Sequence, residues 1–118
     1  MRYLGMGLGL LVGLSALTGC GANCQSTCEK AFREDAPNCN IKVPGVPDQD
    51  DLIRDCVTEC EGALTKTGDL DGYDPDQPLS GETFTLENEK QAAVWMDCVD
   101  QTACENLDKG VCPGGGIN

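Results

Sequence analysis

Apolar residues recur at helical spacing in three stretches of the chain, separated by polar segments rich in proline and glycine. The first stretch covers residues 23–36, the second residues 50–66 and the third residues 86–110. In each stretch the apolar side chains fall three or four positions apart and form one stripe, which is typical of an amphipathic helix. Asn23 and Thr85 precede the first and third stretches and are candidate N-caps. The pattern predicts an all-α fold, a helical hairpin followed by a third helix.

Two of the polar segments differ from ordinary short loops. Residues 68–83 are acidic and carry prolines and glycines throughout, so we expect no regular structure there. Residues 113–118 read Pro-Gly-Gly-Gly-Ile-Asn, and this composition predicts a flexible tail. We therefore divide the chain into a leader of residues 1–19, a cysteine-rich helical domain of residues 20–112 and the tail.

The first residues have the composition of a signal peptide. Arg2 supplies a positive charge, and residues 4–17 are apolar or small and uncharged. This stretch is shorter than the roughly 20 apolar residues of a membrane-spanning helix, although an N-terminal anchor helix is the alternative interpretation. The boundary Leu17-Thr18-Gly19-Cys20 resembles the lipobox of bacterial lipoprotein precursors.

The lipobox resemblance implies a specific modification. The Cys20 thiol would carry diacylglycerol, a signal peptidase would cut after Gly19, and the new amino group would usually be acylated, for example with palmitate. A residue other than aspartate after the lipidated cysteine, here Gly21, favours the outer membrane if the host has one. The expected location is the cell envelope, on the outer membrane of a Gram-negative host or otherwise on the outer face of the cell membrane.

The cysteine count agrees with export. The chain has nine cysteines, and assigning Cys20 to lipid leaves an even number. A small exported domain uses such cysteines as disulfides, whereas a zinc site would require paired Cys-x₂-Cys motifs, which this chain lacks. The expected disulfide cysteines are Cys24, Cys28, Cys39, Cys56, Cys60, Cys98, Cys104 and Cys112.

Two Cys-x₃-Cys motifs, starting at Cys24 and Cys56, place their thiols one helical turn apart on one face. This doubled motif resembles the twin Cys-x₃-Cys hairpins of small mitochondrial intermembrane-space chaperones. In the antiparallel hairpin that the resemblance implies, Cys24 pairs with Cys60 and Cys28 with Cys56. We take the geometry from this resemblance and not the chaperone function.

The four remaining cysteines allow three arrangements. Cys98 and Cys104 lie about 120° apart around a continuous helix, so they should not pair with each other. Of the other two arrangements we prefer Cys39–Cys98 with Cys104–Cys112, because Gly110 would let the chain turn back beside the third helix.

Composition excludes several functions. A net charge of −12 opposes binding to nucleic acid, and the absence of histidine removes the commonest general base and metal ligand. No catalytic constellation is visible, so we do not expect an enzyme. The acidic segment suggests weak calcium binding as an alternative, although an EF-hand loop started at its first aspartate lacks three required residues. The candidate ligands are Asp69, Asp71, Asp74 and Asp76.

Three classes of function therefore remain open at the level of sequence. The first is a non-enzymatic envelope lipoprotein that is held to the membrane by lipid on Cys20 and is structural or binds an envelope protein partner. The second is a weak calcium-binding module. The third is a thiol-redox or chaperone-like protein that uses the doubled cysteine motif.

Overall fold

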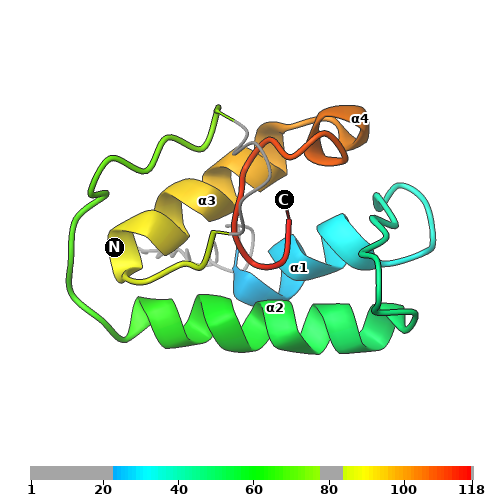
Figure 1. Ribbon diagram of the computed structural model, residues 1–118, viewed down its shortest axis with the longest axis horizontal. Helices are drawn as coiled ribbons and strands as arrows, with labels where there is room; N and C mark the ends of the chain where they lie inside the picture. Colours follow the sequence, from blue (N-terminus) through cyan, green and yellow to red (C-terminus); the bar gives the residue numbers. More distant parts are fainter. Residues whose placement is uncertain (1–22, 78–83, 118) are drawn as a thin grey trace, which may run out of the picture.

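A computed structural model describes residues 23–77 and 84–117 and has the predicted all-α architecture (Figure 1). Its helices are α1 (Cys24–Phe32), α2 (Gln49–Leu64), α3 (Glu89–Gln101) and the short α4 (Cys104–Leu107). The helices α1 and α2 form the hairpin, and each of the three long helices packs against the other two. The core therefore lies where α1, α2 and α3 meet.

Side-chain caps determine where the helices begin. Asn23 accepts a hydrogen bond from the backbone N–H of Ser26 at 2.9 Å and forms a capping box at the start of α1, as predicted. The N-cap of α3 is Asn88 and not Thr85, because the Asn88 side chain accepts hydrogen bonds from the N–H groups of Lys90 and Gln91. The third helix therefore begins three residues later than predicted.

Helix α3 also ends earlier than predicted, at Gln101, and α4 follows as a separate turn. The ammonium group of Lys30 in α1 donates hydrogen bonds to three carbonyl oxygens at this end, those of Val99, Asp100 and Thr102. A cation at a helix C-terminus is favourable because free carbonyls carry the negative end of the helix dipole. A long-range contact thus ends a helix that local periodicity would continue to residue 110.

Two adjacent disulfides join the arms of the hairpin. Cys24 pairs with Cys60 and Cys28 with Cys56, with Cα–Cα distances of 5.7 and 5.8 Å. These are the two predicted bonds, and they confirm that α1 and α2 run antiparallel. All four cysteines are at most 4% exposed, so the bonds belong to the core.

The preferred pairing of the other four cysteines is wrong. The structure joins Cys39 to Cys104 and Cys98 to Cys112. The prediction assumed one helix from residue 86 to 110, but the break after Gln101 moves Cys104 onto α4, beside the loop that carries Cys39. Cys98 and Cys104 do not pair with each other, as expected.

The tail predicted to be flexible is instead packed in the core from Pro113 to Ile117. Ile117 is fully buried, and Gly114 and Ile117 form a small antiparallel bridge. The segment passes between the helices (Figure 1): Gly115 lies beside Trp95 of α3 and Cys56 of α2, while Gly116 lies beside Phe32 of α1. Glycine composition suggested mobility, but here the absence of side chains allows close approach to three helices.

Two further hydrogen bonds hold this C-terminal segment. The Trp95 indole N–H donates to the carbonyl of Cys112 at 3.1 Å, and the Tyr73 hydroxyl donates to the carbonyl of Pro113 at 2.6 Å. Both bonds are buried, so each would leave an unsatisfied polar group if the segment moved away. The segment is therefore part of the fold.

The close packing at Gly115 yields a stability prediction. A Cβ at this position would overlap the Trp95 ring, and the residue has a φ of +61°. Gly45 has a positive φ of +88° but open space around it, so Gly45→Ala isolates the backbone cost. Overpacking should make Gly115→Ala about 1–3 kcal/mol more destabilising than Gly45→Ala, as measured by denaturant unfolding. Equal losses would show that the segment does not fill the core.

Candidate functional site

The lipidation motif and Gly21 fall within residues 1–22, outside the residues that the structure describes. Within the described ranges, no helix combines the length and apolar character needed to cross a bilayer. The candidate sites that can be placed are the disulfide cysteines, the acidic segment and the surface of the hairpin.

The structure does not bring the four predicted calcium ligands together. The Asp69 side chain is 83% exposed and lies 4.0 Å from the ammonium group of Lys90. An Asp74 oxygen accepts a hydrogen bond from the N–H of Asp76, and Asp71 has a φ of +52° in a turn. Across residues 23–77 and 84–117, no three carboxylate or cysteine side chains could hold a metal ion. Turns at residues 71–72 and 75–76 separate the four aspartates along the segment.

The acidic segment instead has its backbone fixed to the rest of the domain. Asn88 and Gln91 of the α3 start donate side-chain hydrogen bonds to the carbonyls of Asp69 and Leu70, and Cys112 N–H donates to the carbonyl of Pro75. Asn88 and Gln91 were not among the residues predicted from the sequence. Polar residues at a helix start carry no hydrophobic periodicity that would show that their side chains are buried.

Glu59 of α2 is a second residue that the sequence analysis missed. One oxygen of its half-buried carboxylate accepts hydrogen bonds from the N–H of Leu86 at 2.9 Å and of Gly115 at 2.7 Å. The carboxylate thus joins α2 to the segment before α3 and to the C-terminal segment. Its bonds are to backbone groups of the same chain, which is a structural role.

Tyr73 is a buried residue of the acidic segment and stacks on Phe84, with ring centroids 4.5 Å apart. Burial raises the pKa of its hydroxyl well above the ordinary value of 10.0, and the charges of Asp74 and Glu59 raise the pKa further. The neutral hydroxyl is the form that donates to Pro113.

A groove between α1 and α2 has a volume of about 660 Å³. We call it the α1–α2 groove. Its principal lining residues are Gln25 and Glu29 on α1, Arg33 at the C-cap of α1, and Gln49, Ile53 and Val57 on α2. Ile53 and Val57 are partly buried and form an apolar floor between charged walls.

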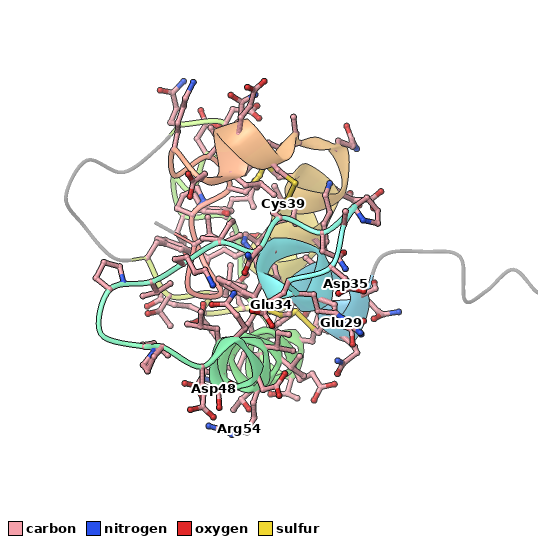
Figure 2. All side chains as sticks on the ribbon, turned by 90° about the vertical axis from the view of Figure 1, so that its right-hand side faces the viewer. Glu29, Glu34, Asp35, Cys39, Asp48 and Arg54 are labelled. Carbon is pink, nitrogen blue, oxygen red and sulfur yellow. A yellow bond between two sulfur atoms is a disulfide. The ribbon has the colours of Figure 1, made fainter. Side chains whose placement is uncertain are left out.

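Acidic side chains gather where the groove meets the loop between the two helices. Viewed from that end, Figure 2 shows Glu29, Glu34 and Asp35 at the end of α1, and Asp48 and Arg54 at α2. A hydrogen bond to its backbone and the neighbouring Arg33 lower the pKa of Asp35, which favours its charged form. This end of the groove is negatively charged.

Comparison of the chain with protein-family models, with curated proteins and with solved structures found no match. Function must therefore be argued from the residues themselves. The four disulfides alone are typical of an extracytoplasmic protein, because the cytosol keeps thiols reduced.

The raised pKa of Tyr73 predicts how stability changes in alkali. The folded state favours the protonated hydroxyl, so this contribution is present below pH 10.0 and is lost as the pH rises above that value. In a Tyr3→Phe variant, Tyr73 is the only tyrosine, and ultraviolet absorbance reports its ionisation. We expect tyrosinate to appear only as helical circular dichroism is lost. Tyrosinate near pH 10.0 with the helices intact would contradict the buried hydrogen bond.

Proposed function

We propose that the protein is a lipid-anchored lipoprotein of the bacterial cell envelope, and that its domain is a non-enzymatic module that binds a partner or is structural. The cysteine pairing is the observation that supports this most. The four disulfides use every cysteine after Cys20, so the odd cysteine of the chain is the one in the lipobox. A thiol without a disulfide partner after a signal-like segment is what lipidation requires.

A lipid on Cys20 would be sufficient to hold the domain. Each buried CH₂ contributes roughly 0.8 kcal/mol, and stable anchoring needs at least two acyl chains, as in diacylglycerol. The domain has a strongly negative charge, so an anionic bilayer surface would repel it. The lipid, and not the protein surface, would supply the attachment.

The start of α1 determines how close the domain is to the membrane. Only Gly21, Ala22 and Asn23 separate Cys20 from Cys24, the first residue of α1. An extended chain gains at most 3.3–3.6 Å per residue, so the tether is on the order of 10 Å long. The end of the hairpin that carries the Cys24–Cys60 bond would then face the bilayer. That bilayer would be the outer membrane if the host has one, because Gly21 and not aspartate follows the lipidated cysteine.

The surroundings of the cysteines argue against a thiol-redox function. Thiol–disulfide exchange needs an accessible sulfur and an attacking thiolate. Cys28 and Cys60 are fully buried and Cys56 is 1% exposed, so the doubled motif is closed to an incoming thiolate. These bonds suit a structural staple better than an exchange site.

Replacement of Cys20 tests the proposal. In the bacterial host, Cys20→Ala should abolish metabolic labelling with radioactive palmitate. The variant should also be found as the uncleaved precursor or in the soluble fraction, in place of the mature protein in the membrane fraction. Gly21→Ala is the matched control, because it keeps the thiol and the residue before the cut, and should remain labelled. Full labelling of Cys20→Ala would refute the lipid anchor.

A further inference from the structure

The α1–α2 groove is the exposed seam of the hairpin. The third long helix and the C-terminal segment pack on the core side of α1 and α2, against Phe32 and Cys56. On the groove side, Ile53 and Val57 are only partly buried. Side chains that are apolar, partly exposed and aligned along a seam are suited to contact with another apolar surface.

Charges along the groove fall into two groups. Arg33 is paired with Glu29 at 3.6 Å and Asp35 at 3.1 Å. Arg54 is likewise paired, with Asp51 at 2.9 Å. Both arginines of the groove are thus already paired with carboxylates of the same chain.

Glu34 and Asp50 form the second group. Both line the groove at its acidic end, and within the described residues neither forms an ion pair. Their negative charge is therefore not paired with a cationic side chain of the described residues and would attract a cationic partner.

Gln49 adds an independent observation at the same end. It lines the groove and is 7% exposed. Its amide nitrogen donates hydrogen bonds to the carbonyls of Phe32 and Ile41, but its oxygen Oε1 has no hydrogen-bond partner among the described residues. A buried acceptor without a donor costs about 1–3 kcal/mol. Because Oε1 has almost no accessible surface, it is a poorly satisfied position in the wall of the groove and not itself a contact for a partner.

These features together indicate which class of molecule would bind in the groove. A metal ion does not fit, since no three acidic side chains of the described chain are close enough to hold one. Widely spaced carboxylates suit the larger ammonium and guanidinium groups of lysine and arginine, which donate several hydrogen bonds. The apolar floor requires aliphatic side chains beside those cations, as in an amphipathic segment laid in a groove.

We propose that the α1–α2 groove binds a basic amphipathic segment of a partner protein. Its apolar side chains lie on Ile53 and Val57, and its cationic groups approach Glu34 and Asp50. This proposal rests on the proposed function, for which it names the class of partner. The Cys24 end of α1 faces the lipid in that function, so the acidic end of the groove points away from the bilayer toward other envelope proteins.

Synthetic peptides test the specificity of the groove. Full-length lipidated protein in phosphatidylcholine nanodiscs is titrated with a fluorescent peptide that has leucines at helical spacing and lysines elsewhere. A second peptide replaces lysine by glutamate, a third replaces leucine by serine, and empty nanodiscs give the background. We expect saturable binding of the leucine–lysine peptide that weakens in high salt, binding of the serine peptide at least about tenfold weaker, and no binding of the glutamate peptide.

Two double variants test the location. Glu34→Gln with Asp50→Asn should weaken binding of the leucine–lysine peptide by about tenfold or more. The control, Glu61→Gln with Glu105→Gln, removes the same charge from exposed positions outside the groove and should change affinity less than about twofold. Nuclear magnetic resonance shifts on peptide addition should be largest at the amides of Ile53 and Val57.

The proposal would be overturned by no binding of the leucine–lysine peptide, by equal binding of the serine peptide, or by equal weakening by both double variants. Equal weakening would show attraction to the overall charge and not to the groove. Dimerisation through this face in place of peptide binding would also overturn it. Mass spectrometry of the same preparation reads the lipid on Cys20 separately, so failure of the groove proposal is distinguishable from failure of the lipid anchor.

Discussion

The fold depends on the two adjacent disulfides between α1 and α2. They lie one helical turn apart and fix the distance and the antiparallel direction of the two helices. Each disulfide contributes on the order of 2–4 kcal/mol, mainly by restricting the unfolded chain, which matters in a chain with only 4% aromatic residues. The same bonds define the seam of the hairpin, so one face of α1 and α2 receives α3 and the opposite face remains as the α1–α2 groove.

The C-terminal segment completes the core that the disulfides begin. It passes between α1, α2 and α3, and Trp95, Tyr73 and Glu59 all bind its backbone. Successive glycines allow this backbone to approach an indole ring and a disulfide closely. The Cys98–Cys112 bond fixes the start of the segment to α3. A sequence that looks like a linker is therefore a packing element, held by hydrogen bonds with buried and half-buried side chains.

The features that the sequence predicted correctly are local ones. Helical periodicity located the three long helices, and the spacing within each Cys-x₃-Cys motif, with the antiparallel geometry, led to two of the four disulfides. The Cys39–Cys104 bond depends on Lys30 and the break after α3, contacts between residues about 70 positions apart. Burial of the glycine segment is also a tertiary effect. The groove could not be predicted because it also depends on tertiary structure. Glu34 and Asp50 are brought to the same end of the groove only because the end of α1 lies beside the start of α2.

In the proposed function, one cysteine is reserved for lipid while the other eight close the domain. Mass spectrometric mapping of unreduced full-length protein, purified from the host membrane, tests it most directly. We expect an N-terminal peptide that starts at lipidated Cys20, together with the linked peptides Cys24–Cys60, Cys28–Cys56, Cys39–Cys104 and Cys98–Cys112. Cys20 in a disulfide, or a free thiol among the other eight, would contradict it.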